Sequence, residues 1–302
     1  MAERVVIAIP TYKRPRSLAR LLDAIAGLRT DAEITVLVAD NDAQQHQGFN
    51  LCGRLTPLYR WPLRAVMERD RGIAQARNRL VAEALKTDAQ FIAMIDDDEW
   101  PDADWISAFL DAQRTTGADV LQGSILFIHE ETGPKPVPDI RHPTGAADML
   151  QGAGNLLICR RVLQDMAAPW FDTAFALTGG EDLDFFLRLK RAGYRFGWAD
   201  EARAFGGVAP LRHDLGWIMK RAYSNGNSDM RVLLKHRPGP ALIARESLKI
   251  LGALLLSLPL ALILGFSANH RRAPLAKICR AIGKLTAMAG AQYNEYAVVH
   301  GE

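Results

Sequence analysis

Short apolar runs alternate with segments of helical spacing across the first half of this chain, and this pattern limits the folds open to it. Val5–Ile9, Ile34–Ala39 and Phe91–Ile95 are uncharged runs of strand length, as expected of strands buried on both faces of a sheet. Between the first two, the apolar residues of segment 18–25 recur at helical spacing. Strands that alternate with helices form βαβ units, so the pattern predicts an α/β fold with a mainly parallel sheet.

The pattern continues towards the middle of the chain. It predicts helices at residues 73–85, 102–114 and 181–191, and strands at residues 120–128 and 194–198. Segment 129–145 is polar and rich in proline, so we expect a loop there.

The composition is that of a folded globular chain. Its 302 residues are 49% hydrophobic, which suffices for one large domain or two modest ones. The three cysteines, Cys52, Cys159 and Cys279, are far apart and form no Cys-x-x-Cys pair, which argues against a disulfide framework and a zinc site. No secretory signal precedes the first predicted strand, so we expect the catalytic body to stay in the cytoplasm.

Charge is distributed unevenly along the chain. Residues 220–284 contain 12 Lys or Arg and two acidic residues, which leaves 25 basic and 32 acidic residues elsewhere. A basic, apolar tail favours attraction to an anionic surface. We therefore predict a catalytic domain at residues 1–235 and a helical, membrane-associating region at residues 236–302, with no nucleic-acid partner.

The tail contains a long uncharged segment. Ile250–Ala268 has no charge for 19 residues, close to the ~20 that a helix needs to cross a bilayer. A single span and an insertion into one leaflet fit this segment equally well. The alternative is a helix in a protein core, which two glycines and Pro259 make less favourable. A second moderately apolar segment, Leu275–Met288, carries three cations at spacings that could face lipid headgroups.

Three adjacent carboxylates, Asp96-Asp97-Asp98, follow the central predicted strand. They repel one another unless a cation or hydrogen-bond donors compensate them. Ligands bind at the carboxyl ends of strands in an open α/β sheet, and hard oxygen ligands suit Mg²⁺ or Mn²⁺. The alternative is a solvated acidic turn that caps the following helix.

Polar groups also follow the neighbouring predicted strands. Pro10-Thr11-Tyr12-Lys13-Arg14 ends the first strand with a turn, an aromatic ring and two cations, and Asp40-Asn41-Asp42 ends the second. Arg77 lies on the first turns of the helix that opens at Gly72. Such groups can stack on a base, accept a hydrogen bond from it and neutralise a diphosphate. Each signal is weak alone, but four at successive strand ends predict one binding site.

These segments, together with Gly179-Gly180-Glu181-Asp182 and the trailing Trp217-Ile218-Met219-Lys220-Arg221, resemble the family-2 glycosyltransferases. The resemblance covers roughly residues 4–235 and is to the bacterial exopolysaccharide branch, such as the succinoglycan-type glucosyltransferases. It implies an inverting enzyme with the GT-A fold, in which a Rossmann-like mixed, mainly parallel sheet is flanked by helices. The C-terminal helical tail resembles the family only in being apolar and basic.

The resemblance also implies roles for single residues. Those implied to hold the nucleotide are Thr11, Tyr12, Asp40 and Arg77, with Asp96 at the ribose. Asp98 would bind the Mg²⁺ or Mn²⁺ that bridges the phosphates, Asn155 would line the donor-sugar pocket, and Asp182 would be the general base. The remaining residues expected to contact substrate are Pro10, Arg14, Asp42, Asp97, Glu181 and Arg212.

The chemistry of inversion suits one carboxylate at Asp182. An acceptor hydroxyl must lose its proton as it attacks the anomeric carbon from the face opposite the leaving diphosphate. A retaining double displacement would need a further carboxylate as nucleophile. Acidic residues at a helix start also favour the helix dipole, an alternative that fits Asp182 and Asp184 equally well.

One position departs from the family pattern. Members often carry a histidine after the last strand of the catalytic domain as a further metal ligand, whereas Phe205 stands there in this chain. Three interpretations are open: the metal relies on Asp98, phosphates and water, His213 replaces the missing ligand, or the site is weakened. We favour the first, and expect Arg212 or His213 to contact phosphate. Trp100, beside the acidic triplet, is the best aromatic candidate for stacking on a sugar, although packing is the commoner role of such a ring.

The sequence therefore predicts an enzyme that transfers a glucose-like sugar from a UDP-sugar to a lipid-linked oligosaccharide. We expect it to act in exopolysaccharide or surface polysaccharide synthesis, at the cytoplasmic face of a bacterial inner membrane. A sugar-1-phosphate nucleotidyltransferase would share the fold, but that chemistry favours a glycine-rich loop after the first strand, which this chain lacks. A non-catalytic membrane subunit that binds nucleotide or acceptor is favoured by Phe205 and disfavoured by the intact aspartates.

Overall fold

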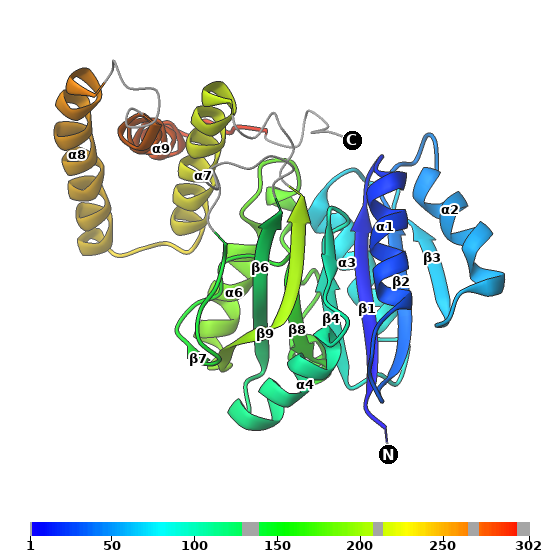
Figure 1. Cartoon of the computed structure of the whole chain (residues 1–302). Helices are drawn as coiled ribbons and strands as arrows, with labels where there is room; N and C mark the ends of the chain where they lie inside the picture. Colours follow the sequence, from blue (N-terminus) through cyan, green and yellow to red (C-terminus); the bar gives the residue numbers. More distant parts are fainter. Residues whose placement is uncertain (1, 129–138, 208–213, 265–271, 295–302) are drawn as a thin grey trace. The chain divides into compact units, whose positions relative to one another are not determined.

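The computed structural model describes residues 2–128, 139–207, 214–264 and 272–294. They divide into two compact units. The first comprises the described residues up to Ala176 together with 181–207, and contains the sheet (Figure 1). The second comprises Leu177–Gly180 together with 214–264 and 272–294, and contains long helices.

A mixed sheet forms the centre of the first unit. Its strands within the described residues are β1 (Arg4–Thr11), β2 (Glu33–Asp40), β3 (Leu63–Met67), β4 (Phe91–Ile95), β5 (Glu99–Pro101), β6 (Val120–Ile128), β7 (Gly145–Ala147), β8 (Asn155–Cys159) and β9 (Phe196–Gly207). Neighbours follow the order β3-β2-β1-β4-β8-β6-β9-β5, and β7 pairs with β9. Strands β1 to β4 pair in parallel, whereas β8 is antiparallel to both β4 and β6. The predicted mixed sheet is confirmed, with parallel pairs among β1 to β4 and between β6 and β9.

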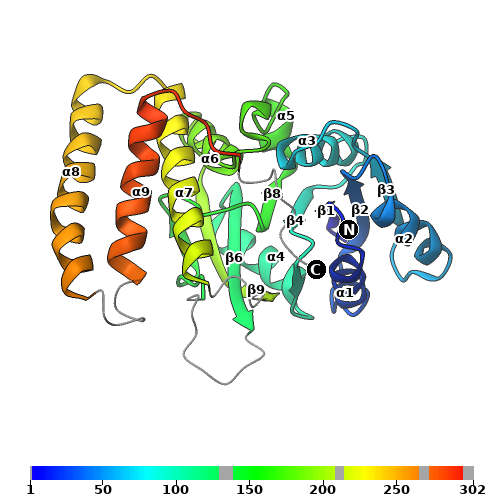
Figure 2. The ribbon, with the colours of Figure 1, turned by 90° about the horizontal axis from the view of Figure 1, so that it is seen from above.

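Helices cover both faces of this sheet. They are α1 (Pro15–Ala26), α2 (Gln47–Leu55), α3 (Ile73–Ala84), α4 (Trp105–Thr116), α5 (Arg160–Asp165) and α6 (Glu181–Arg191). Helices α1 and α4 lie on one face and α3, α5 and α6 on the other (Figure 2). Within β1, Ile7 and Ile9 enter the first core and Val6 and Ala8 the second, because successive strand side chains point to opposite faces.

Helix α1 confirms the helical spacing predicted for segment 18–25. Pro15 occupies its first turn, where the missing N–H of proline leaves no intrahelical bond unmade. Its four core side chains, Leu18, Leu21, Leu22 and Ile25, are fully buried. Each such burial contributes about 1.5–3 kcal/mol, so one apolar stripe suffices to hold the helix on the sheet.

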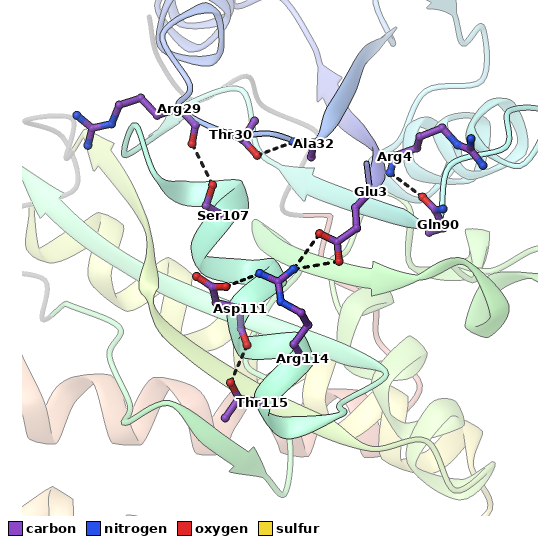
Figure 3. Close-up of polar contacts among 10 residues, drawn as sticks. All are labelled: Glu3, Arg4, Arg29, Thr30, Ala32, Gln90, Ser107, Asp111, Arg114 and Thr115. Carbon is purple, nitrogen blue, oxygen red and sulfur yellow. Dashed lines mark hydrogen bonds and ion pairs between the residues drawn. The ribbon is translucent and has the colours of Figure 1, made fainter. Parts of the chain in front are cut away.

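Exposed polar contacts connect the elements at the amino-terminal end of β1 (Figure 3). Arg114, near the end of α4, bonds both carboxylate oxygens of Glu3, at 3.1 and 2.9 Å, and also pairs with Asp111. The backbone N–H of Arg4 donates to Gln90 Oε1 at 2.6 Å. Exposed pairs of this kind contribute about 0–1 kcal/mol each. These contacts lie at the opposite end of the strands from the polar residues that are predicted to form a site.

The strand order changes direction at β1. The chain adds β2 and then β3 on one side of β1, and places β4 on the other. A crevice forms at such a switch point, outside the carboxyl ends of the two diverging strands. Here those ends are Thr11 of β1 and the Asp96-Asp97-Asp98 triplet that follows β4.

Two predicted boundaries were wrong for the same physical reason. The predicted helix at 102–114 begins at Trp105, because residues 99–101 form β5, which pairs with β9. The backbone N–H of Asp102 continues this pairing by donating to Arg203 O at 2.9 Å. Strand β9 correspondingly extends to Gly207 rather than ending at residue 198. Of the predicted loop at 129–145, residues 129–138 lie outside the described residues.

The second unit contains α7 (Leu215–Lys235), α8 (Pro240–Ile263) and α9 (Arg272–Met288). Within it, α9 packs against both other helices and lies between them (Figure 2). Helix α7 thus belongs to the same compact unit as α8 and α9, although the sequence places residues 215–235 in the predicted catalytic domain. The end of that domain at residue 235 stays a prediction. Among the described helices, α8 alone is long and apolar enough to cross a membrane, with a mean hydropathy of 1.8 and only 17% of its apolar window buried. By composition and length alone this is weak evidence for membrane contact, but the low burial argues against a core helix.

Candidate active site

Asp97 is buried and ties the end of β4 to the turn after β1. Its carboxylate accepts hydrogen bonds from Thr11 Oγ1 at 2.8 Å and from Arg14 Nη1 at 3.0 Å. Burial raises the pKa of Asp97 to about 7, although the neighbouring Arg14 lowers it. Asp97 therefore fixes the two strand ends relative to each other. The hydroxyl of Thr11 donates its hydrogen bond to Asp97 and not to a ligand.

Asp96 and Asp98 flank Asp97 and are the exposed members of the triplet. Their side chains are 34% and 29% exposed. Asp98 Oδ2 lies 3.1 Å from Arg14 Nη1, so the same arginine compensates both Asp97 and Asp98. The triplet thus divides into one carboxylate that holds the fold and two that can meet a ligand.

The backbone of Gly154 lies directly beside Asp96 and Glu99. A Cβ atom at this glycine would lie 3.0 Å from Glu99 Oε1 and 3.2 Å from Asp96 Oδ2, so a side chain there would crowd both carboxylates. Within the described ranges, no group of three or more His, Cys, Asp or Glu side chains is arranged to hold a metal. The donor set therefore fits Mg²⁺ or Mn²⁺ only if phosphate and water oxygens supply most of the ligands.

Arg77 connects the triplet to the start of α6. Its side chain is 5% exposed, with Nη1 2.6 Å from Glu181 Oε1 and Nη2 3.0 Å from Asp96 Oδ1. The guanidinium also lies over the Phe171 ring, 5.7 Å from its centroid. The contact of Arg77 with the nucleotide stays a prediction; in this structure Arg77 holds two carboxylates, one of them on the residue before Asp182.

Glu181 and Asp182 begin α6 beside this arginine. Burial and, to a smaller extent, the charge of Asp182 raise the pKa of Glu181 to about 7, while Arg77 opposes both effects. Burial also raises the pKa of Asp182, and Arg77 again lowers it. Asp182 Oδ1 accepts from the N–H of Leu183 at 2.7 Å, and its Oδ2 faces the backbone of Gly152, where a Cβ would lie 3.7 Å away.

Asp184 has a different environment from Asp182. It is fully buried and pairs with Arg188 at 3.0 Å, one helical turn further on. The structure therefore separates two carboxylates that the spacing left equivalent: Asp184 belongs to the helix, whereas Asp182 lies at the site.

The end of β2 shapes the neighbouring loops. Asp40 is fully buried and accepts from the N–H groups of Asp42 at 2.9 Å and Phe49 at 2.8 Å. The Asn41 amide donates to Glu68 O at 3.0 Å and Asp70 O at 2.8 Å, and accepts from the N–H of Gly72 at 2.7 Å. These bonds hold the loop that begins α3 and so place Arg77. The predicted contacts of Asp40 with the nucleotide and of Asp42 with substrate remain predictions, and both side chains are buried in this conformation.

Tyr12 is the aromatic residue at the end of β1. It is partly exposed, with Arg71 5.0 Å and Lys13 5.4 Å from its ring centroid. A ring with two cations beside it suits a base and the phosphates attached to it. Pro10, by contrast, is buried within β1 opposite Ala39 and offers only its backbone.

Asn155 lies in β8 and has no group to offer a sugar in this structure. It is fully buried; its Oδ1 accepts from Trp105 Nε1 at 2.8 Å, and its Nδ2 donates to Ser124 O at 3.0 Å and Ala202 O at 2.9 Å. The place of Asn155 in the donor-sugar pocket stays a prediction, and in this structure Gly152 and Gly154 lie beside the carboxylates.

We expect Asn155→Ala to lower stability by about 3 kcal/mol or more, since three buried partners would lose their hydrogen bonds at about 1–3 kcal/mol each. Urea unfolding would measure this, with Asn50→Ala at an exposed position as the control. The KM for the donor should not change in the folded fraction. A raised KM at unchanged stability would instead place Asn155 in the donor pocket.

Phe205 packs where the family pattern often has a metal-binding histidine. It lies opposite Trp100 in the β5–β9 pair, with ring centroids 6.2 Å apart in a stacked arrangement. The guanidinium of Arg20 lies 3.7 Å from the centroid of the Trp100 ring. Packing therefore accounts for Trp100, and stacking of this ring on a sugar gains no support. Arg212 and His213 lie outside the described residues.

The sequence predicted no role for Glu99, Gly152 or Gly154, although these residues lie beside the carboxylates of the candidate site. Glu99 directly follows the triplet, and this adjacency was the available signal. The glycines gave no signal of their own, since only their position against Asp182, Asp96 and Glu99 in the fold marks them.

Solved structures with this arrangement of strands are known. A mannosyltransferase from Pyrobaculum calidifontis, solved with GDP-Man and Mn²⁺, superposes with a TM-score of 0.62 at 14% identity, covering 94% of this chain and 88% of its own. S. aureus TarS 1-349, solved with UDP, gives 0.53 at 14% identity, covering 99% and 95%. This chain spans only 42% of another, longer TarS chain. At these identities the likeness shows the fold alone, which is GT-A-like.

The sequence comparisons are more specific. The family model described as glycosyl transferase family 2 matches residues 6–160, just over half of the chain. The chain belongs to this family and is a glycosyltransferase, as the residues at the strand ends predicted. It is also 29% identical over 240 residues to the succinoglycan biosynthesis protein ExoM of Rhizobium meliloti, covering 77% of this chain and 76% of that protein.

Proposed function

We propose that this glycosyltransferase inverts the anomeric centre of a nucleotide-sugar and uses Asp182 as the general base. The observation that carries the proposal is the bridge made by Arg77, which bonds both Asp96 and Glu181. Arg77 thereby holds Asp96, a carboxylate suited to the donor, beside the residue that precedes Asp182. Single displacement needs donor-binding groups and a base at one site, because the attacking hydroxyl and the leaving diphosphate lie on opposite sides of the anomeric carbon.

Asp182 is suited to take the proton of an acceptor hydroxyl. Its pKa is raised by burial, which makes it a stronger base than an exposed aspartate, while Arg77 keeps it from rising further. The bond from the Leu183 N–H holds Oδ1, and Oδ2 is directed towards the Gly152 backbone. The carboxylate is therefore oriented before substrate binds.

Asp98 is the residue that would hold Mg²⁺ or Mn²⁺ together with the diphosphate, and Asp96 would contact the ribose. When bound, the metal would stabilise negative charge on the leaving nucleotide. Arg14 occupies Asp98 in this structure and would have to share it or release it. We infer that the free protein binds metal weakly and that the donor completes the site.

Asp98→Asn should raise the Mn²⁺ concentration needed for half-maximal activity at least tenfold and lower kcat by about 10²-fold. Stability should change little, because Asp98 is 29% exposed and Arg14 keeps its bond to Asp97. A titration of activity against Mn²⁺ would measure the shift, with the exposed Asp88→Asn as the control. An unchanged Mn²⁺ requirement would exclude Asp98 as a ligand.

The donor is proposed to be a UDP-sugar with a glucose-like ring. Support comes from the resemblance of the site motifs to succinoglycan-type glucosyltransferases and from the relative involved in succinoglycan biosynthesis. Thermal-shift measurements with UDP-, GDP- and dTDP-sugars, each with Mn²⁺ or Mg²⁺, would identify the nucleotide. Preference for GDP, the nucleotide in the complex of the Pyrobaculum enzyme, would overturn the assignment to UDP.

The acceptor is proposed to be a lipid-linked saccharide at the cytoplasmic face of the membrane. The exposed, apolar α8 and the basic surplus of residues 220–284 support a membrane-held, anionic acceptor such as a polyprenyl diphosphate. Transfer of radiolabelled sugar to bacterial membranes, compared for wild type and Asp182→Asn, would test it. If neither incorporates sugar from any donor, the proposal of a lipid-linked acceptor in these membranes is rejected.

A further inference from the structure

Helix α8 presents a broad apolar surface to solvent. We define its leucine face as Leu248, Leu251, Leu255, Leu256, Leu258, Leu260, Leu262 and Ile263, all of which are between 44% and 79% exposed. A large exposed apolar patch on a folded unit typically marks a surface that binds a protein partner or a membrane. Within Ile250–Ile263 there is no charged residue to interrupt it.

The opposite side of α8 packs on the other helices of its unit. Ile250 is 4% exposed and forms a small core with Ala281 of α9 and Met230 of α7, against which Ala253 and Leu254 pack. Ser257 is also buried. The helix therefore has one side committed to protein and one side uncovered.

Helix α9 is in turn fixed to α7 by close backbone approach. A Cβ at Gly226 of α7 would lie 2.1 Å from Arg280 O, and a Cβ at Gly283 of α9 would lie 2.1 Å from Tyr223 O. Arg280 also pairs with Asp229 of α7 at 2.5 Å. Helix α9 cannot follow α8 into another environment without breaking these contacts.

A charged clip holds α8 to α9 at the start of the leucine face. Glu246 of α8 lies 2.7 Å from Lys249 and 2.8 Å from Lys284 of α9. The two lysines hold the pKa of Glu246 at about 2, so the clip stays ionised at neutral pH. Ionised groups at the centre of a bilayer are strongly disfavoured, so this end of α8 must stay at the aqueous boundary.

The packing of α9 along α8 also argues against a span. Lys284 of α9 reaches Glu246 near the start of the leucine face, so the two helices lie against each other. A crossing by α8 would carry α9 and its cations Lys277, Arg280 and Lys284 into the hydrocarbon, where charged side chains are strongly disfavoured.

We propose that α8 enters a single leaflet of an anionic membrane with its leucine face and does not cross it. The cations of α9 and Lys249 then lie at headgroup level, where basic side chains are attracted to anionic lipid. Charge complementarity selects this occupant: the segment 220–284 that contains the leucine face has 12 basic and two acidic residues. The inference rests on the proposed membrane association and gives it a geometry, but it does not depend on sugar transfer.

Vesicle binding would test the surface. Wild type should float with vesicles of three parts phosphatidylcholine to one part phosphatidylglycerol, and Leu255→Glu with Leu262→Glu should lower the bound fraction at least tenfold. Leu58→Glu is the matched control, since Leu58 is a 96% exposed leucine in the first unit, and it should bind within twofold of wild type. Vesicle binding by the double variant equal to that of wild type would overturn the proposal. So would a wild-type protein that forms a stable dimer and does not bind vesicles.

Accessibility of residues on either side of α8 would test the geometry. In a chain whose three native cysteines are replaced by alanine, Lys235→Cys and Ala273→Cys place single thiols before α8 and at the exposed start of α9. In inner-membrane vesicles with the cytoplasmic face outward, a membrane-impermeant maleimide should label both equally. Labelling of only one of them before detergent is added would mean that α8 spans.

The outcome is independent of the catalytic proposal. Transfer to a short-chain, water-soluble acceptor analogue should be unchanged in the Leu255→Glu, Leu262→Glu variant. Loss of vesicle binding with this transfer intact supports the leaflet proposal. Absence of transfer in wild type that still binds vesicles would reject the transferase mechanism and leave the membrane geometry standing.

Discussion

Replacing Asp182 with asparagine should lower kcat by about 10²–10⁴-fold, the usual contribution of a general base. The side chain keeps its shape and can still accept from the N–H of Leu183, so the fold and the donor KM should change little. Single-turnover transfer measured with saturating donor and acceptor would separate the chemical step from binding. Calorimetric titration of the nucleotide would show whether the donor site is intact.

Asp184→Asn provides the matched control two residues further along α6. Asp184 is fully buried with Arg188, so this variant should lose stability while the folded fraction keeps its kcat. Equal losses of kcat in both variants would mean that helix packing, not proton transfer, explains the effect. Full activity of Asp182→Asn would remove Asp182 from the mechanism.

Arg77→Met should lower the stability of the fold by about 3–5 kcal/mol at pH 8, because breaking a buried ion pair leaves a charge without compensation. Glu181 and Arg77 are 3% and 5% exposed, so water can replace the lost bond only by entering the core. The loss should be smaller near pH 5.5, where Glu181 can take up a proton. Urea unfolding at both pH values would measure the difference.

The sign of this pH dependence follows from the pKa of Glu181. In the folded wild type it is raised to about 7, above its ordinary value of 4.5, so folding holds a proton that the unfolded chain releases. Stability from this group therefore falls as the pH rises from about 4.5 to 7. Removing Arg77 raises the folded pKa further and extends the fall to higher pH, since Arg77 is the group that lowers it.

Two further variants would identify the cause. Arg77→Met combined with Glu181→Gln should recover most of the stability lost at pH 8, because no buried charge remains at that pair. Arg79→Met, on the exposed side of the same helix, should cost at most about 1 kcal/mol. The acidic limb of kcat/KM should also move to higher pH in Arg77→Met, because Arg77 lowers the pKa of Asp182. A double variant no more stable than the single one would contradict the charge argument.

The predictions that depended on periodicity were confirmed most closely. Helix α6 has the predicted bounds, and α3 differs by one residue, because apolar residues at helical spacing specify which face is buried. The short β5 had no such pattern. Three residues cannot display a period, and only pairing with β9, about a hundred residues further on, makes Glu99–Pro101 a strand.

The family and the strand ends that carry polar groups could be predicted because both depend on residues close together in the chain. The separate roles of the carboxylates within the site could not be predicted in this way. Asp96, Asp97 and Asp98 are chemically identical in the sequence, and burial against Thr11 and Arg14 assigns the middle one to the fold.

The sequence by itself determined that this chain is an α/β glycosyltransferase with an acidic site at the strand ends and a basic, apolar tail. Only the tertiary structure decided that Arg77 joins Asp96 to Glu181, residues 85 positions apart, and that Asn155 is bonded within the core. The physical reason is that composition and spacing specify which groups are present. The charge of each group and its remaining capacity for hydrogen bonds depend on its burial and on the distance to its partners. Both are defined only once distant segments of the chain are packed together.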